Sequence, residues 1–180
     1  KVIIHSTVAP GTTERLQEYF KRNCLFAHSP VTGVHPNLLE GLKTFPRWIG
    51  IDNTYMFSGI IEHLELMGFS PVRVVSSRTT ELLKLLCTTY YGVCIAFHAE
   101  VQGILEKADV RWEDFIEWNH QYNAGYKKLG MAHVNRPVLE KLNIPIGGHC
   151  VVPNAVILAE IFDSPFFDLI LKYSADNPVL

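Results

Sequence analysis

The sequence lacks the features that would point to nucleic acid or to a membrane as its partner. No run of basic residues occurs, and the net charge is −2, so the basic patch typical of a nucleic-acid binder is missing. The longest apolar stretches are interrupted by charged residues or by Thr-Thr-Tyr-Tyr at 88–91, so we expect no transmembrane span. No secretory signal opens the chain. With 180 residues, 48% of them hydrophobic, the composition is that of an ordinary globular protein.

Cysteine is also scarce, which bears on disulfides and on metal binding. The four cysteines are widely scattered, at Cys24, Cys87, Cys94 and Cys150. A disulfide framework is denser than this, so we expect free thiols and a cytoplasmic location. Zinc sites usually show two close ligand pairs, and neither C-x-x-C nor H-x-x-x-H occurs among these cysteines and the eight histidines. No metal is expected.

The first 75 residues alternate between predicted strands and predicted helices. Strands are expected at 2–5, 24–28, 47–51 and 72–75, and helices at 12–22, 37–42 and 54–67. Thr12 or Thr13 is the predicted N-cap of the first helix, and Asp52 caps the third. Strand–helix–strand units of this spacing are typical of an α/β layer with a largely parallel sheet.

The pattern changes after residue 76 to one that predicts helices. Residues 79–107 contain no proline and have apolar residues nearly all the way round, which predicts a helix of roughly 29 residues, about 43 Å long. Such a helix must be buried on most sides, so we expect a second subunit to cover it in a homodimer. Further helices are expected at 112–128, 154–162 and 165–173.

Two positions have the residue types of a reactive site. Cys150 follows Gly147 and Gly148, whose missing side chains let the backbone approach a bound molecule, and a thiol there can act as a nucleophile. A lone loop cysteine is more often inert, so the reactivity of Cys150 depends on the residues around it. Lys84 is the only cation between Arg78 and Lys107 on a helix that is otherwise apolar. The alternative is an ordinary ion pair with Glu81, three residues earlier.

Four segments, in this order, resemble motifs of the UDP-glucose/GDP-mannose dehydrogenase family, the NAD-dependent sugar-nucleotide 6-dehydrogenases. Residues 6–13 are similar to its S-T-V-x-P-G-T-T, residues 80–85 to its A-E-x-x-K-L, residues 95–100 to its I-A-F-x-N-E, and residues 147–150 to its G-G-H-C. The resemblance covers nearly the whole chain but only the middle of such an enzyme. The G-x-G-x-x-G unit that holds the dinucleotide pyrophosphate does not occur.

The resemblance implies a fold of two parts. Residues 1–76 would be the C-terminal half of a Rossmann-like nucleotide-binding domain, an α/β layer. Residues 77–180 would be an all-α domain, helical and 6-phosphogluconate-dehydrogenase-like, which pairs subunits through its long central helix. The chain would then be a fragment, or a truncated and divergent member of the family.

The resemblance also implies a chemistry. Cys150 matches the nucleophile that attacks an aldehyde at C6 of the sugar to form a thiohemiacetal. After hydride transfer to NAD, water hydrolyses the resulting thioester. Lys84 matches the lysine that stabilises the oxyanion. Thr7 and Pro10 fall in a segment near the cofactor. The alternative is that this segment serves only to start the next helix.

The substrate, a nucleotide sugar, would meet residues from several motifs. By the same resemblance Gly147, Gly148, Glu40 and Thr88 are the expected substrate contacts. Asparagine is usual in the family at the position of Thr88.

Two further differences concern the base that activates water. Asn154 stands where the family has aspartate, and Ser29-Pro30-Val31 lacks the carboxylate of its S-P-E. Asparagine cannot serve as a general base. Either His149 or His35 takes over, or the chemistry differs or is lost. A non-catalytic protein that keeps the fold for dimerisation or ligand binding therefore stays open as the alternative.

Overall fold

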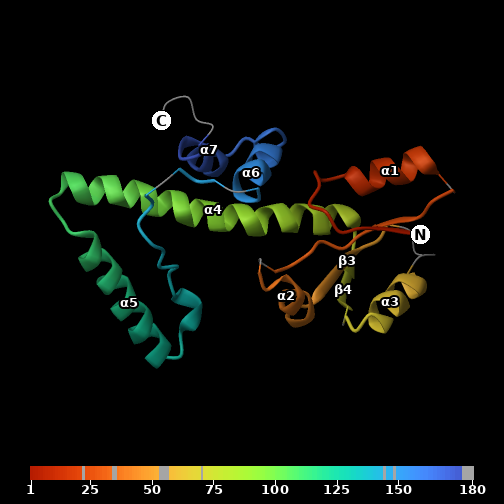
Figure 1. Cartoon of the computed structure of the whole chain (residues 1–180), viewed down its shortest axis with the longest axis horizontal. Coiled ribbons are helices and arrows are strands. Elements are labelled where there is room, and N and C mark those ends of the chain that lie inside the picture. Colours follow the sequence, from red (N-terminus) through yellow and green to blue (C-terminus); the bar gives the residue numbers. More distant parts are fainter. Residues whose placement is uncertain are drawn as a thin grey trace. The chain divides into compact units, whose positions relative to one another are not determined.

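The computed structural model describes residues 1–21, 23–33, 36–52, 57–69, 71–143, 145–147 and 149–175. The chain divides into two compact units, Lys1–Cys87 and Thr88–Leu180. The division falls inside the longest helix, α4 (Ser77–Lys107), which runs through the centre of Figure 1. The predicted domains, 1–76 and 77–180, have their boundary at the start of this helix, and their identities stay predictions.

A small sheet forms the base of the first unit. Its strands lie in the order β1 (Val2–Ile4), β2 (Phe26–His28), β3 (Arg47–Gly50) and β4 (Pro71–Val75). The pairs β1–β2 and β3–β4 are parallel, as predicted. The pair β2–β3 is antiparallel and meets at His28 and Gly50. The sheet is therefore mixed, with two of its three pairings parallel.

Three helices complete the first unit with the start of α4. They are α1 (Thr12–Phe20), α2 (Leu38–Thr44) and α3 (Phe57–Leu66). All three predicted helices are present, although residues 54–56 of the third lie outside the described residues. Buried side chains from β2, β3 and α3 form one apolar core of Ala27, Ile49, Ile60 and Leu64. This alternation of strands and helices confirms the α/β character predicted for the first part.

The predicted caps of two helices differ from those in the structure. Neither Thr12 nor Thr13 is the N-cap of α1, because Gly11 occupies that position with a φ of 86°. This left-handed conformation suits glycine, which has no Cβ to clash. The Asp52 carboxylate accepts hydrogen bonds from the backbone N–H (3.0 Å) and the hydroxyl of Ser77, the first residue of α4. The start of the helix that Asp52 was predicted to cap lies outside the described residues.

The second unit is helical, as predicted. It contains the rest of α4, then α5 (Trp112–Lys128), the short 3-10 turn η2 (Ala132–Val134), α6 (Val151–Ala159) and α7 (Pro165–Lys172). Figure 1 shows α6 and α7 beside α4. The approach is close at Gly92, where an added Cβ would lie 2.6 Å from Cγ1 of Val151 and 3.0 Å from Cδ1 of Ile170.

The helix α4 bears on the expectation that the chain has no transmembrane span. By length and composition alone, it is the one helix among the described residues that could cross a membrane, and a third of its most apolar window is buried in this single chain. The core helices of soluble proteins pass the same test, so the finding is weak evidence for a span.

Candidate functional site

Lys84 lies at a hollow in the first unit, which we call the Lys84 hollow. It has a volume of about 160 Å³. One wall is a face of α4, because its residues recur at helical spacing. The other walls come from the loop after β2 and from the start of β3. The lining residues are Pro30, Thr32, Pro46, Trp48, Thr80, Leu83, Lys84 and Cys87. Lys84 is half-buried there, as suits a cation that would stabilise charge on a small ligand.

Glu81, one turn before Lys84, fixes the start of α1. Its side chain is completely buried. One carboxylate oxygen accepts from the backbone N–H of Gly11 at 2.6 Å, and the other from the N–H and the hydroxyl of Thr13 at 2.8 and 2.6 Å. The carboxylate therefore replaces a local side-chain N-cap and also supplies the negative charge that a helix N-terminus favours.

The predicted cofactor segment leads into this cap. Thr7 and Pro10 are half-buried in the stretch between β1 and α1. The Thr12 hydroxyl donates to the carbonyl of Ala9 at 2.6 Å, which tightens the turn before the helix. The first N–H groups of α1 are occupied by Glu81. This helix terminus is therefore not free to hold a pyrophosphate.

Cys150 lies in the second unit, at the start of α6. Its side chain is exposed, and it occupies the N-cap position, because α6 begins at Val151. The predicted start at residue 154 was therefore three residues too late. The backbone N–H of Asn154 donates to the Cys150 carbonyl at 3.3 Å, and Asn154 itself is buried. His149 is exposed next to the cysteine.

The other predicted site residues are dispersed. Glu40 is exposed in the first turn of α2, and Thr88 is half-buried one turn after Lys84. Gly147 is exposed, and an added Cβ would meet only the Pro145 carbonyl oxygen at 3.9 Å, an ordinary contact. Gly148 and His35 lie outside the described residues. Lys84 belongs to the first unit and Cys150 to the second, so their predicted convergence on one cleft stays a prediction.

Sequence reasoning did not single out the buried His28 at the end of β2 as part of a site. Its Nδ1 lies 2.7 Å from the Thr80 hydroxyl, and its Nε2 lies 3.1 Å from the carbonyl oxygen of Ser6. Burial lowers the pKa of this imidazole from its ordinary value, while the bond to Ser6 and the charge of Glu81 act in the opposite direction. One signal was present, since Thr80 stands where the family motif has alanine.

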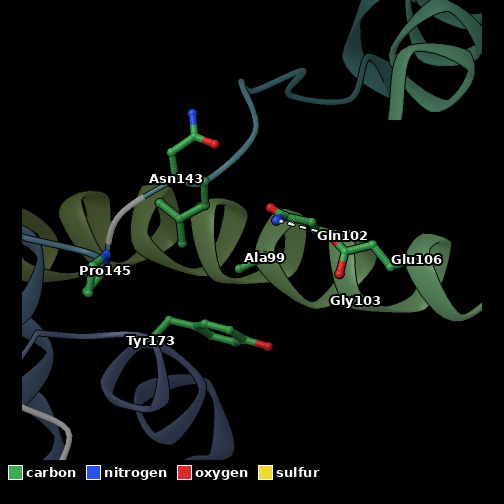
Figure 2. A pocket seen from close by; sticks show the side chains of 8 residues that line it. Ala99, Gln102, Gly103, Glu106, Asn143, Pro145 and Tyr173 are labelled. Atoms are coloured by element: carbon green, nitrogen blue, oxygen red, sulfur yellow. Dashed lines mark hydrogen bonds between the residues drawn. The ribbon is translucent and has the colours of Figure 1, made fainter. Parts of the chain in front are cut away.

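A second and larger hollow, of about 500 Å³, lies in the second unit. Figure 2 shows it between α4, the residues Asn143 and Pro145, and Tyr173 after α7. Burial raises the pKa of Tyr173, whose hydroxyl also interacts with Glu100. None of the predicted site residues lines this hollow. Among the described residues, no group of three or more histidine, cysteine or acidic side chains could hold a metal ion.

Comparison with curated protein sequences gives relatives that share one name. No family model matches the chain. UDP-N-acetyl-D-mannosamine dehydrogenase of Methanococcus maripaludis is 25% identical over 150 residues, which are 83% of this chain and 32% of the relative. The enzyme of the same name from Methanocaldococcus jannaschii is 26% identical over 152 residues, 83% of this chain and 33% of the relative. The chain thus spans about a third of the length of the curated relatives it matches.

Solved structures agree on the fold. The chain resembles an NDP-N-acetyl-D-galactosaminuronic acid dehydrogenase from Methanosarcina mazei with a TM-score of 0.72 and 21% identity, covering 96% of this chain and 39% of that one. For a UDP-glucose dehydrogenase from Pyrobaculum islandicum the TM-score is 0.68 at 18% identity, covering 96% and 40%. For a GDP-mannose dehydrogenase from Pseudomonas aeruginosa it is 0.57 at 16% identity, covering 97% and 42%.

The chain is homologous to the central portion of the UDP-glucose/GDP-mannose dehydrogenase family. The sequence matches cover 83% of this chain, and the structural matches cover 94% or more of it for both a UDP-N-acetylmannosamine and a UDP-glucose enzyme. The family resemblance and the fold class predicted from the motifs are therefore confirmed.

Proposed function

We propose that the chain supplies the helical centre and part of the catalytic site of a sugar-nucleotide dehydrogenase that acts on a UDP-N-acetylhexosamine. The relatives named UDP-N-acetyl-D-mannosamine dehydrogenase support the substrate class. The observation that carries the proposal for this chain's own residues is that Lys84, from the matching motif at 80–85, is half-buried at a hollow of the first unit. A cytoplasmic location follows for an enzyme of soluble nucleotide sugars.

In this proposal Lys84 and Cys150 act on the same carbon. The Cys150 thiolate adds to the C6 aldehyde of the sugar, and the bond from sulfur to carbon leaves a negative charge on the aldehyde oxygen. The ammonium of Lys84 stabilises this oxyanion before it is protonated. Water later displaces the thiol from the oxidised product and releases the carboxylate.

The described residues fit NAD only in part. In this proposal Thr7 and Pro10, which precede α1, contact the cofactor, but the first turn of α1 does not hold the pyrophosphate, because Glu81 occupies its N–H groups. When bound, NAD would accept the hydride. We therefore expect the chain by itself to bind NAD with a dissociation constant above about 10 μM, which corresponds to roughly −7 kcal/mol. Titration calorimetry measures this directly.

The exposed apolar residues of α4 support a homodimer. Tyr90, Tyr91, Phe97 and Ile104 are all more than half exposed in the single chain. A helix with large apolar side chains on several exposed faces gains by burying them against a second copy. Light scattering at micromolar concentration should give twice the mass of 20.4 kDa, and a monomer would contradict the proposal.

The experiment that tests the activity follows a covalent intermediate. The dehydrogenase to which the chain is proposed to contribute is incubated with UDP-N-acetylmannosamine and NAD, formation of NADH is followed by absorbance, and Cys150 is examined by mass spectrometry. We expect oxidation in the wild type, none in Cys150→Ser, and a large loss of rate in Lys84→Met. Cys24→Ser is the matched control, because Cys24 lies away from both motifs. Wild-type rates in Cys150→Ser would exclude the mechanism.

One observation favours the non-catalytic alternative. The buried Asn154 supplies an amide where the family has aspartate, so the chain lacks that carboxylate beside Cys150. A ligand-binding protein without turnover would bind the nucleotide sugar but would produce neither NADH nor an adduct on Cys150. The same experiment therefore separates the two functions.

A further inference from the structure

The hydrogen bonds of His28 define which ring nitrogen carries its proton. Nε2 lies 3.1 Å from the carbonyl oxygen of Ser6, which can only accept, so Nε2 must donate. In the neutral ring Nδ1 is then an acceptor, and it lies 2.7 Å from the Thr80 hydroxyl. His28 is completely buried, and the hydrogen-bond partner of this lone pair is the Thr80 hydroxyl.

The Thr80 hydroxyl has a second partner, which lets the pair accept a proton at no cost in hydrogen bonds. Its oxygen also lies 2.9 Å from the carbonyl oxygen of Ser77, one turn earlier on α4. When His28 is neutral, the hydroxyl donates to Nδ1. When His28 is protonated, Nδ1–H donates to the hydroxyl, which turns to donate to Ser77. Every donor therefore keeps an acceptor in both states, which buried polar groups require.

The surroundings of the pair connect it to the Lys84 hollow. Thr80 lines that hollow together with Lys84, one turn further along α4. The completely buried Glu81 from α4 stabilises a charged imidazole, and His5, after β1, opposes it. On β3, the buried Arg47 donates to the Pro30 carbonyl at 3.3 Å. With its pKa lowered by burial, His28 is neutral at pH 7 and able to take a proton.

We propose that His28, acting through the Thr80 hydroxyl, is the proton acceptor of the Lys84 hollow. A water molecule bound in the hollow gives a proton to Oγ1 of Thr80, while the proton already on that oxygen passes to Nδ1 of His28. One O–H bond of the water breaks and one N–H bond forms. The products are a hydroxide beside Lys84 and an imidazolium at His28, with no electrons exchanged.

This role answers a question that the sequence left open, and it rests on the proposed function. Thioester hydrolysis needs an activated water, yet Asn154 and Val31 stand where the family has carboxylates. Of the two histidines suggested as replacements, His149 is exposed in the second unit and His35 lies outside the described residues. Among the described histidines, His28 is the one with a hydrogen-bond contact to a residue of the Lys84 hollow, Thr80.

The proton route can be tested without any activity, by nitrogen NMR of the full chain labelled at histidine. At neutral pH we expect the proton of His28 to lie on Nε2. On acidification Nδ1 should also take up a proton, and this proton should exchange with solvent through the Thr80 hydroxyl. Thr80→Val keeps the shape of the side chain but removes the hydroxyl, so this exchange should be lost. Thr80→Ser should restore it. Thr79→Val is the matched control, because the Thr79 hydroxyl contacts Ser76.

Two NMR results would overturn the proposal. The first is a neutral His28 that carries its proton on Nδ1. The second is an exchange rate in Thr80→Val equal to that of the wild type, which would mean that protons reach His28 by another path.

The pH profile of the dehydrogenase reaction tests the catalytic role. In His28→Gln we expect kcat to fall roughly 100-fold, with KM unchanged, and the acid limb of the profile to disappear. An unchanged limb would overturn the role of His28 while the proposed function stands. If no nucleotide sugar is oxidised but Thr80→Val still blocks proton exchange, the proposed function is wrong and the proton route into the hollow is retained.

Discussion

The two halves of α4 are held by different kinds of contact. Before residue 88, long-range hydrogen bonds to polar side chains fix the helix, through Glu81, Thr80 and the bond from Ser77 to Asp52. After residue 88, His98 and Glu100 still make long-range hydrogen bonds, and close apolar packing is added to them. There Gly92 lets Val151 and Ile170 approach, and Ala96 joins the buried cluster with Ile146 and Val152.

This difference predicts different responses to mutation. Where a buried carboxylate makes the contacts, stability depends on single acceptor atoms, because each donor left without an acceptor costs free energy. Apolar packing responds to volume, because a core tolerates changes of chemistry but not of shape. Substitutions in the two halves of one helix should therefore follow two separate rules.

The largest effect is expected from Glu81→Leu in the first half. The change leaves the N–H groups of Gly11 and Thr13 and the Thr13 hydroxyl without their acceptor in a buried place, so the free energy of unfolding should fall by about 3 to 5 kcal/mol. Urea unfolding measures the loss, and hydrogen exchange should locate it in α1. The control is Glu14→Gln, which removes an exposed ion pair with Arg78 and should change little. Equal effects of both substitutions would refute the assignment of Glu81 as the cap.

The second effect concerns volume in the second half. In Gly92→Ala the new Cβ overlaps Val151, so we expect a loss of about 1 to 3 kcal/mol in the free energy of unfolding. Gly103→Ala is the matched control, because nothing lies within 4 Å of a Cβ there. That variant should gain about 0.5 to 1 kcal/mol from helix propensity alone. If thermal unfolding gave stability changes of the same sign for both variants, the result would contradict the close approach at Gly92.

A smaller loss of stability is expected on acidification. It arises at His28, which contacts Thr80 in the first half of α4. The pKa of His28 in the folded chain is lowered from its ordinary value of 6.5 by burial, so the unfolded chain takes up the proton first as the pH falls. The stability that depends on neutral His28 is therefore fully present above pH 6.5 and is lost progressively below it. Urea unfolding at a series of pH values should show this decline, and His28→Gln should flatten it. A decline that persists in the variant would assign it to other groups.

The smallest effect is a difference in reaction rate that leaves stability unchanged. Cys150 is exposed at the N-terminus of α6, where the helix N–H groups favour a negative charge, so iodoacetamide should label it faster than Cys24, Cys94 or Cys87, which is also exposed. If Lys84 and Cys150 share one cleft, Lys84→Met should slow the labelling of Cys150 and leave that of Cys24 and Cys94 unchanged. Mass spectrometry of each cysteine over time gives the rates. Equal rates for all four would leave the homology intact and remove the site.

Much of the fold could be predicted because it depends on local patterns. The helix α5 has the predicted bounds, and Gly68 ends α3 in a left-handed conformation with a φ of 81°. The four motifs together predicted the family, and the motif around Lys84 contains a predicted site residue that lines a hollow. Such features follow from apolar periodicity, from glycine's conformational freedom and from short segments that are read in order.

The sequence by itself thus determined the order of the elements, the family and the identities of Lys84 and Cys150 as candidate residues. The tertiary structure decided which side chain caps which helix and which residue faces the hollow. Glu81 caps a helix that begins about 70 residues earlier, and Thr80 meets a histidine 52 residues away. These contacts join residues distant in the chain, and no local propensity or spacing encodes them. They form only when strands and helices pack, because a buried carboxylate or imidazole must then find whichever partners the fold has placed beside it.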